Sequence, residues 1–331
     1  MFPLDHDGAL APAAPARAGL PPVEHAPAVD CAVVVVTYES AQFLPRLLDS
    51  LPAAAGGRTY SVVVVDNAST DRVRDVVRGR SCVRFVQSDR NLGYSGGINL
   101  AARDLPDCRW VLVLNPDLTL GPGAISAMIE TALRTGAAAV VPRIVDGDGQ
   151  TSFSLRREPT LRRSVGEALL GDHVPGRPGW ASEIVRGPAV YGQERTVDWA
   201  TGAAMLVSRS VFDHVGPWDT RYFLYSEETD FCRRIRAAGG RIRYTPTAVV
   251  SHSGGGSGTS PALVALCALN RVRYAHKWHG GGVASAAWGV AVVHALLRIT
   301  RPGERASLRV LTSARARRLL PGASTAAGGR T

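Results

Sequence analysis

Cysteine and lysine are both scarce in this chain of 331 residues. The five cysteines are an odd number, lie far apart and form no C-x-x-C pair. Three of them lie in or beside apolar runs, so we expect buried thiols in a reducing compartment rather than a disulfide framework. The N-terminus also lacks a basic start followed by an apolar core, so we expect no signal peptide.

The glycine-rich phosphate motifs of the common nucleotide-binding folds are missing as well. No G-x-G-x-x-G follows either of the first two predicted strands, which argues against a dinucleotide-binding Rossmann domain. No G-x-x-x-x-G-K-[ST] occurs anywhere, which argues against a P-loop nucleotidase. A ligand of this chain therefore has to be held by other groups.

Acidic residues are almost absent from the C-terminal part. Residues 271–331 hold eleven Lys or Arg and one acid, Glu304, and this excess equals the formal net charge of +10 of the whole chain. A neutral body with a basic tail argues against a nucleic-acid groove. It favours a tail that contacts an anionic membrane surface. The segment 280–297, which precedes most of the arginines of this tail, is nearly long enough for a membrane span but weakly apolar.

The apolar pattern predicts strands that alternate with helices. The expected strands are 31–36, 60–65, 83–87, 110–114, 138–142, 199–207, 241–245 and 248–251. The expected helices are 43–51, 71–78, 91–104, 123–135 and 228–238. This order predicts an α/β fold with a mainly parallel sheet and one functional edge. Residues 143–198 carry no clear pattern besides a hairpin turn at 146–149, and residues 1–29, rich in Ala and Pro, are expected to be disordered.

Polar residues follow the buried strands. Asn115-Pro116-Asp117 ends the run 110–114, and Pro116 stops strand pairing there because it lacks an N–H. A carboxylate at this edge suits a divalent cation on a diphosphate, although an ordinary turn would give the same triplet. Asp66 after the second strand could hold a ribose or a base, or could simply cap a helix.

An acidic cluster occurs at Glu227, Glu228 and Asp230, beside several aromatic residues. On a helix that starts near Glu227, Asp230 shares its face, and acids in a first turn also favour the helix dipole. Solvated caps and a sugar site with a general base therefore both remain open. His252 ends an apolar strand and is either structural or a metal ligand.

Four stretches of the sequence resemble family 2 glycosyltransferases with the GT-A fold, in particular the bacterial rhamnosyltransferase-like branch. They are "VVVVTYES" with "VVVVDNASTD", "NLGYSGGINLA", "WVLVLNPDL", and "WATGAAMLVSRSVFDHVGPWDTRYFLYSEETDFCRRIRAAG". The resemblance covers about residues 30–275. It implies a catalytic domain at 30–258 and a helical, Arg-rich extension at 259–331 that meets the membrane.

The resemblance also assigns roles to individual residues. The implied donor-binding residues are Thr37, Glu39, Asp66, Asn91, Gly93, Asn99, Asn115 and Asp117. The implied acceptor-binding residues are Trp199, Gly202, Ala203 and Asp230. Asp117 and His252 would bind Mg²⁺ or Mn²⁺, and of the pair Glu227 and Glu228 the second is the expected base.

The implied activity is an inverting transfer of a sugar from a nucleotide-diphosphate donor to a hydroxyl of a glycan or a polyprenyl-diphosphate-linked acceptor. dTDP-rhamnose is the favoured donor and a UDP-sugar the second. Such an enzyme would work in cell-wall or polysaccharide synthesis, in the cytoplasm and peripherally on the inner face of the cell membrane. Two alternatives stay open: nucleotidyl transfer on a related sheet, and a non-catalytic sugar- or lipid-binding protein of the same fold.

Overall fold

The computed structural model describes residues 28–171, 177–252 and 260–322. Most of the expected disorder at 1–29 therefore lies outside the described residues. The strands are β1 Val29–Thr37, β2 Tyr60–Asp66, β3 Val83–Gln87, β4 Cys108–Leu114, β5 Leu118–Leu120, β6 Ala139–Val145, β7 Leu155–Arg156, β8 Arg195–Val197, β9 Trp199–Ala200, β10 Ala204–Ser208 and β11 Ile242–His252. The helices are α1 Leu44–Ala55, α2 Val73–Val77, α3 Gly93–Ala102, α4 Ala124–Thr135, α5 Leu161–Leu170, α6 Pro188–Tyr191, α7 Arg209–Val215, α8 Glu227–Ala237, α9 Pro261–Leu297, α10 Pro302–Thr312 and α11 Ala314–Arg317.

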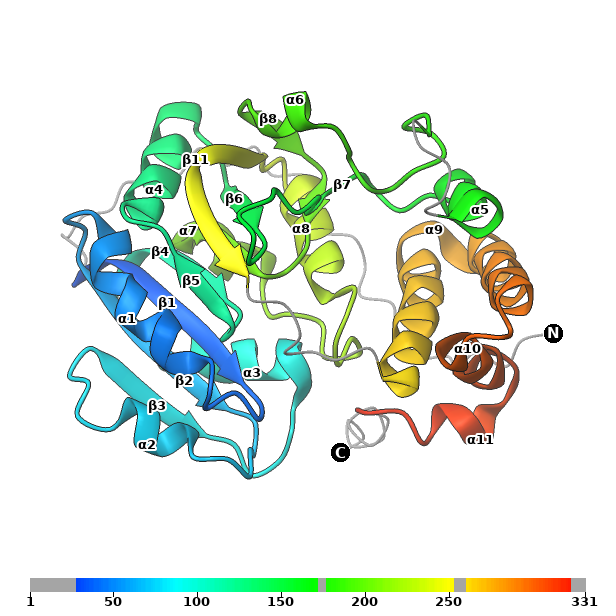
Figure 1. Cartoon of the computed structure of the whole chain (residues 1–331), viewed down its shortest axis with the longest axis horizontal. Helices are drawn as coiled ribbons and strands as arrows, with labels where there is room; N and C mark the ends of the chain where they lie inside the picture. The colour runs from blue at the N-terminus through cyan, green and yellow to red at the C-terminus, as the bar shows by residue number, and fades with distance from the viewer. Residues whose placement is uncertain (1–27, 172–176, 253–259, 323–331) are drawn as a thin grey trace.

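One mixed sheet forms the centre of the molecule (Figure 1). Its strands follow the order β3-β2-β1-β4-β10-β6-β11-β5, and β8 pairs with β11 beside this path. The first four are parallel, as are β6 and β11, while β10 runs antiparallel between β4 and β6. The expected α/β fold with a mainly parallel sheet is confirmed.

Helices cover both faces of this sheet because its central strands are apolar on both sides. In β1, Val33 and Val35 pack in the layer of α1 and α4. Val34 and Val36 pack in the opposite layer, with residues of α3, α7 and α8. The carboxyl ends of β1, β2 and β4 consequently meet at one edge, where the polar residues that follow these strands gather.

Three predicted segments differ from the structure. The expected strand 199–207 is broken into β9 and β10, and β9 pairs with β7 in a separate small sheet. The two expected strands at 241–251 are one strand, β11, with an irregular register between Thr245 and Val249. Pro246 lies at that irregularity, where a residue without an N–H does least harm to strand pairing. The hairpin turn at 146–149 is confirmed by the bond from the Gly149 N–H to the Asp146 carbonyl.

A group of helices lies beside the sheet, formed by α5, α9, α10 and α11 (Figure 1). Gly280, at φ 80° and ψ 175°, interrupts α9, so that segments 261–279 and 281–297 are two helical halves. The first half and α10 form a small core around Leu266, Leu269 and Val310, against which Phe223 and Leu224 pack. The C-terminal helices are thus attached to the loop that precedes α8.

Candidate active site

A cavity of about 750 Å³ lies at the carboxyl ends of β1 and β4 and beside the start of α8. This volume falls in the range of small-molecule sites. The expected residues that line it are Thr37, Glu39, Asn91, Gly93, Asn115, Asp117, Gly202, Ala203, Glu227, Glu228 and His252. The fold therefore brings together residues from six separate parts of the sequence.

The pairing of β5 with β11 brings Asp117 and His252 together. His252 lies opposite Leu118 in the antiparallel register, and its Nε2 lies 3.0 Å from Asp117 Oδ2. Asp117 is buried, and its hydrogen bond raises the pKa of the half-exposed His252 imidazole. The N–H of Asn115 donates to the Ala203 carbonyl at 2.8 Å, which holds the triplet against the next strand.

Asp117 and His252 are the side chains best placed to hold a divalent cation. A carboxylate oxygen and an imidazole nitrogen that meet at hydrogen-bond distance can both turn to one ion, and both are common metal ligands. Among the described residues, no three His, Cys, Asp or Glu side chains gather into a metal-binding group. A cation at this pair would take its remaining ligands from a diphosphate and from water.

Glu227 and Glu228 form the opposite wall at the N-terminus of α8. Two consecutive residues with positive φ, Tyr225 at 70° and Ser226 at 72°, turn the chain sharply before them. Each glutamate has an Oε2 that is buried without a hydrogen-bond partner. Polar atoms of this kind are costly in a folded protein and often mark a site that meets a ligand.

The two glutamates differ in what stabilises their charge. Burial raises the pKa of Glu227 well above its usual value, and the charge of Glu228 raises it further. Burial also raises the pKa of Glu228, but backbone N–H groups, including that of Gly202, and the Arg156 charge lower it. The surroundings of Glu228 thus include groups that favour its charged form, whereas burial and the neighbouring Glu228 disfavour that of Glu227.

Gly93, the first residue of α3, allows the loop before α8 to pack closely against it at Phe223. It has φ of 71°, and a Cβ there would lie 2.3 Å from the Phe223 carbonyl oxygen. The next N–H, of Tyr94, donates to the same oxygen at 2.8 Å, and the Tyr94 hydroxyl donates to the Gly202 carbonyl at 3.2 Å. Only glycine fits this approach, which places the α8 glutamates beside the strand ends.

Asp66, the expected contact of a ribose or base, is not among the residues that line the cavity. Its carboxylate accepts from the Thr37 hydroxyl at 3.0 Å, from the Ser69 N–H at 3.2 Å and from Gln87 Nε2 at 2.7 Å. These donors saturate the carboxylate, which fixes the turn after β2. The neighbouring Asn67 lines the cavity instead, with a buried Oδ1 that has no hydrogen-bond partner.

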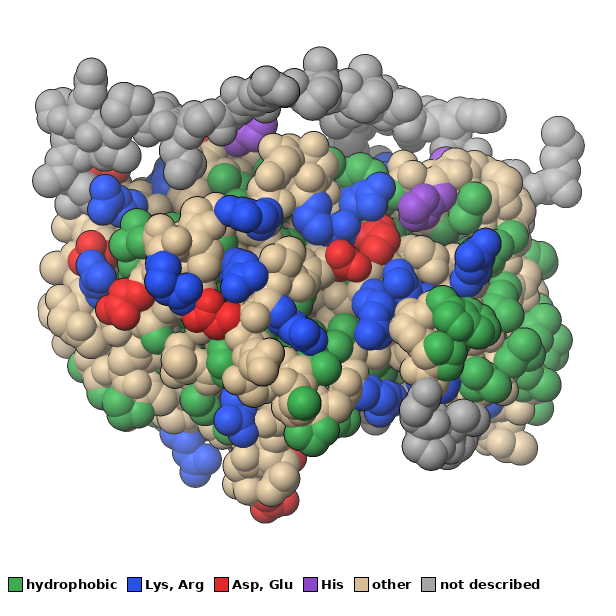
Figure 2. Space-filling view, turned by 90° about the horizontal axis from the view of Figure 1, so that it is seen from above, with side chains coloured by type: hydrophobic (Ala, Val, Ile, Leu, Met, Phe, Trp, Pro, Cys, Tyr) green, Lys and Arg blue, Asp and Glu red, His purple; other side chains and the backbone are tan. Residues whose placement is uncertain are grey.

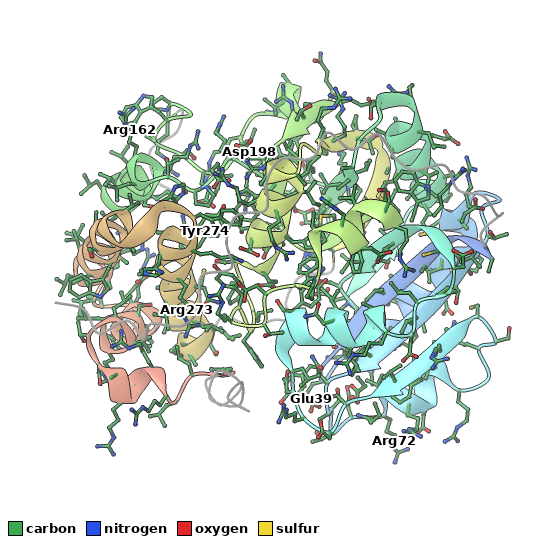
Figure 3. The ribbon with its side chains drawn as sticks, turned by 180° about the vertical axis from the view of Figure 1, so that it is seen from behind. Glu39, Arg72, Arg162, Asp198, Arg273 and Tyr274 are labelled. Carbon is green, nitrogen blue, oxygen red and sulfur yellow. The ribbon has the colours of Figure 1, made fainter. Side chains whose placement is uncertain are left out.

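Glu39 lies at the exposed end of the cavity (Figure 3). Its φ is 50°, and its carboxylate accepts from the Thr70 N–H at 2.8 Å. The Glu39 N–H donates to the Ser69 hydroxyl at 2.9 Å. The turns after β1 and β2 therefore brace each other at the cavity rim.

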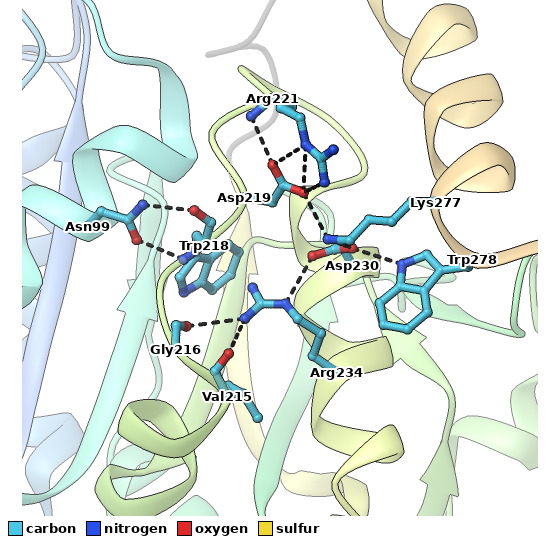
Figure 4. Close-up of polar contacts among 10 residues, drawn as sticks. All are labelled: Asn99, Val215, Gly216, Trp218, Asp219, Arg221, Asp230, Arg234, Lys277 and Trp278. Atoms are coloured by element: carbon cyan, nitrogen blue, oxygen red, sulfur yellow. Dashed lines mark hydrogen bonds and ion pairs between the residues drawn. The ribbon is translucent and has the colours of Figure 1, made fainter. Parts of the chain in front are cut away.

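Asn99 and Asp230 also lie outside the cavity, in a polar network behind it (Figure 4). The Asn99 amide donates to the Trp218 carbonyl and accepts from the Trp218 N–H, both at 2.8 Å. Asp230 is fully buried and is held by Arg234, Lys277 and Trp278 at 2.6 to 3.0 Å. The polar atoms of both side chains are held by hydrogen bonds and ion pairs within the protein.

Trp199, an expected acceptor-binding residue, is also not among the residues that line the cavity. Its indole is buried and its Nε1 donates to the Arg157 carbonyl at 2.9 Å. The residue lies on β9, behind the chain that reaches the cavity at Thr201 and Gly202. Trp199 therefore supports the wall of the cavity and does not line it.

Arg156 lines the cavity and could not be recognised from the sequence. It is the one Arg or Lys among the described lining residues, and its guanidinium donates to the Leu155 carbonyl at 3.1 Å. Burial lowers the pKa of Arg156. It lies in the stretch 143–198, where no periodic pattern marks the residues, so no local signal could have found it.

Comparisons with known proteins agree with this geometry. The profile of the glycosyl transferase family 2 matches residues 32–189. The N-acetylglucosaminyl-diphospho-decaprenol L-rhamnosyltransferase of Mycobacterium tuberculosis is 37% identical over 243 residues, which are 70% of this chain and 78% of that protein. The low-salt glycan biosynthesis hexosyltransferase Agl10 of Haloferax volcanii is 32% identical over 211 residues, which are 62% of each chain.

Among solved structures, the mannosyltransferase PcManGT of Pyrobaculum calidifontis in complex with GDP-Man and Mn²⁺ superposes with a TM-score of 0.53 at 16% identity. The match covers 93% of this chain and 83% of that one, and it confirms the GT-A type of fold. With a relative 37% identical matched over 78% of its length, and with the motifs in the order that the sequence predicted, the chain belongs to glycosyl transferase family 2.

Proposed function

We propose that this glycosyltransferase binds a nucleotide-diphosphate sugar through Asp117, His252 and a divalent cation, and that Glu228 activates the acceptor hydroxyl. This proposal rests mainly on one observation: the Asp117–His252 pair and the Glu227–Glu228 pair line the same cavity of about 750 Å³. One pair suits a departing diphosphate, and the other suits proton removal from an incoming hydroxyl.

The charge of the cavity supports metal dependence. Four carboxyl groups line it, from Glu39, Asp117, Glu227 and Glu228, against one guanidinium, from Arg156. A diphosphate would add more negative charge to this space, so a cation has to accompany it. A bound Mg²⁺ or Mn²⁺ would supply positive charge to the diphosphate as it leaves the sugar.

The surroundings of the two glutamates support Glu228 as the base. Groups around Glu228 favour its charged form, and its side chain packs against Gly202, where an acceptor would enter. Glu228 takes the hydroxyl proton while that oxygen attacks the anomeric carbon from the face opposite the diphosphate. A single displacement of this kind inverts the anomeric centre, and general-base help contributes about 10²–10⁴-fold to the rate.

Two alternative functions find less support. A nucleotidyltransferase needs a glycine-rich, basic loop after the first strand to hold a triphosphate, and residues 37–40 are Thr-Tyr-Glu-Ser. A non-catalytic protein of this fold has no need for unpartnered, buried carboxylate oxygens, which both Glu227 and Glu228 retain. Catalysis explains these costly groups more directly.

The donor and acceptor are proposed by similarity. The relative from Mycobacterium tuberculosis is named for transferring L-rhamnose to N-acetylglucosaminyl-diphospho-decaprenol. We assign the same classes to this chain: dTDP-rhamnose as donor, with a UDP-sugar second, and a polyprenyl-diphosphate-linked glycan in cell-wall synthesis as acceptor.

An acceptor that cannot leave the bilayer requires an enzyme that reaches the membrane. In the described part of the chain, α9 is the one helix long and apolar enough to cross a membrane. Its two halves, 261–279 and 281–297, are each shorter than the roughly 20 residues of a span. We therefore propose peripheral attachment at the inner face of the cell membrane, through the helical extension from residue 259 onward.

The test measures release of nucleoside diphosphate by the purified full chain from a panel of nucleotide-sugars, with and without Mg²⁺ or Mn²⁺. We expect slow, metal-dependent release without acceptor and a large stimulation by a polyprenyl-diphosphate-linked sugar. Asp117→Asn should nearly abolish both the release without acceptor and the stimulated reaction. It removes the carboxylate charge that binds the cation, and the cation in turn binds the diphosphate. An Asp117→Asn variant with unchanged metal dependence and at least half the wild-type rate would refute the assignment.

A further inference from the structure

A second cavity, of about 390 Å³, lies among the C-terminal helices. It is partly open and is enclosed by α5, by both halves of α9 and by α10. Its apolar lining comes from α5 and from both halves of α9, for example Leu161, Ala168, Val272, Ala275, Val283 and Val290, while α10 contributes Glu304 and Ser307. An apolar space of this size is in the range of ligand-binding cavities.

This second cavity meets the catalytic cavity. Tyr225 and Leu263 line both of them. Tyr225 lies two residues before Glu227, in the turn with positive φ that leads into α8. A molecule that extends past these two side chains therefore reaches from the catalytic glutamates into the helical extension.

The charged groups in the second cavity are paired with one another. Arg271 Nη2 lies 3.1 Å from Glu167 Oε2 and also contacts the Glu183 carboxylate. His294 Nε2 lies 3.4 Å from Glu304 Oε1. The guanidinium is thus already neutralised by two acids, so the space is better suited to hydrocarbon than to a phosphate.

The helices that form this cavity expose apolar side chains on their outer faces. On α5, Val165 and Leu169 are exposed while Ala168 lines the cavity. On α9, Leu297 is 61% exposed while Val290 lines the cavity. Figure 2 shows hydrophobic side chains gathered at this end of the molecule, with Lys and Arg side chains beside them. The mainly apolar cavity therefore lies behind helices whose outer faces also carry exposed apolar side chains.

We propose that the cavity between α5, α9 and α10 binds the first part of the hydrocarbon chain of the lipid-linked acceptor. This inference rests on the proposed function, because the occupant is the lipid of that acceptor. The diphosphate and sugar of the acceptor then lie in the catalytic cavity, on the Glu228 side of Tyr225 and Leu263. This cavity selects acceptors by the length of their hydrocarbon chain, whereas the residues of the catalytic cavity select the sugar.

The experiment fills the cavity and compares acceptors of different chain length. Ala287 lines the second cavity, whereas the adjacent Ala286 is exposed, so Ala287→Phe and Ala286→Phe form a matched pair on the same turn of α9. The probes are N-acetylglucosaminyl-diphospho-decaprenol and the same head group on a short, water-soluble alkyl chain. Melting temperatures of both variants check the fold, and Ala268→Leu, on the first half of α9, fills the same cavity if Ala287→Phe does not fold.

In the wild type we expect the long-chain acceptor to have at least tenfold higher kcat/KM than the short-chain one. Ala287→Phe should raise KM for the long-chain acceptor at least tenfold and leave the short-chain and donor KM values unchanged, while Ala286→Phe matches the wild type. Equal kcat/KM for both chains, or equal effects of the two variants, would overturn the proposal. Donor hydrolysis without acceptor tests the proposed function separately, because it requires no lipid.

Discussion

Glu227 and Glu228 are adjacent in the sequence and line the same cavity, but the protein treats their charges differently. Backbone N–H groups and the Arg156 charge lower the pKa of Glu228, whereas burial and the charge of Glu228 raise the pKa of Glu227. A pair with separated pKa values is a common way to keep one acid ionised and the other protonated. Two substitutions at the scale of the residue test this division.

Replacing Glu228 with Gln should lower kcat by about 10²–10⁴-fold with little change in KM for the donor, because a base acts only in the transition state. Steady-state kinetics with the lipid-linked acceptor measures this effect. Glu227→Gln serves as the control and should retain most of kcat. If the two variants exchange these results, the base is Glu227 and the assignment is wrong by one residue.

The raised pKa of Glu227 also predicts how stability depends on pH. A carboxyl whose pKa is higher in the folded protein than in the unfolded chain favours folding at a pH where it is protonated in both states. This contribution to the free energy of unfolding is lost as the pH rises through the pKa of the folded state. Glu227→Gln should therefore melt like the wild type below the usual glutamate pKa of 4.5 and at a higher temperature at neutral pH. A gap between the two melting curves that does not widen with pH contradicts this expectation.

The sequence was informative about residues that follow strands and less so about residues that contact distant partners. Asp117, Glu228 and His252 could be placed because strand ends and a helix start are visible in local patterns. Asn99 and Asp230 could not be judged locally, since their partners Trp218, Lys277 and Trp278 lie 47 to 119 positions away. A polar residue is free for a ligand only when nothing else in the fold has taken its hydrogen bonds.

At the scale of the element, the regular strands and helices up to residue 142 could be predicted because each is long and periodic. The short β5 was missed, although it carries the pairing that joins Asp117 to His252. Residues 143–198 gave no pattern because tertiary contacts hold them. The carbonyls of Ser182 and Ile184, for example, accept from Arg157 at 3.3 and 3.1 Å.

The interruption of α9 gives a test at this scale. Gly280 has φ of 80° and ψ of 175°, a conformation that is essentially confined to glycine. Gly280→Ala should lower the free energy of unfolding by about 1–3 kcal/mol, measured by urea denaturation. Gly289→Ala is the control, since Gly289 lies in a helical part of α9 with open space at the position of a Cβ, and should stabilise by about 1 kcal/mol. A neutral Gly280→Ala variant would mean that α9 has no fixed kink.

At the scale of the whole molecule, the basic excess and the apolar surface lie on the same extension. Within the extension, exposed Leu296 and Leu297 lie shortly before the exposed Arg301, and α5, which packs on α9, carries the exposed Leu169 and Arg162. Apolar contact and attraction of about 1 kcal/mol for each basic residue near an anionic leaflet add together in such a surface. Removing residues 298–331 would be a poor test, because Val310 and Leu311 of α10 belong to the buried core.

Single charge substitutions provide the better test of membrane attachment. The wild type should sediment with anionic vesicles at low salt and be partly released at high salt, because salt screens the arginines. Leu297→Asp should weaken vesicle binding at least tenfold, since it adds a negative charge to an apolar contact. Leu133→Asp is the control, as Leu133 is similarly exposed but lies on α4, away from the extension. Equal binding by both variants would place the membrane contact elsewhere.

The strand order of the central sheet has a consequence for the newly made chain. β6 leaves the ribosome early, yet both of its neighbours, β10 and β11, are translated later. Asp117 and His252 are 135 positions apart, which at 5–20 residues per second is roughly 7–27 s of synthesis. Until β10 is made, β6 lacks both of its neighbours, and until β11 is made one side of β6 stays unpaired and Asp117 has no His252 beside it. The Asp117–His252 pair therefore forms only when β11 enters the sheet, in the same step that gives β6 its second neighbour.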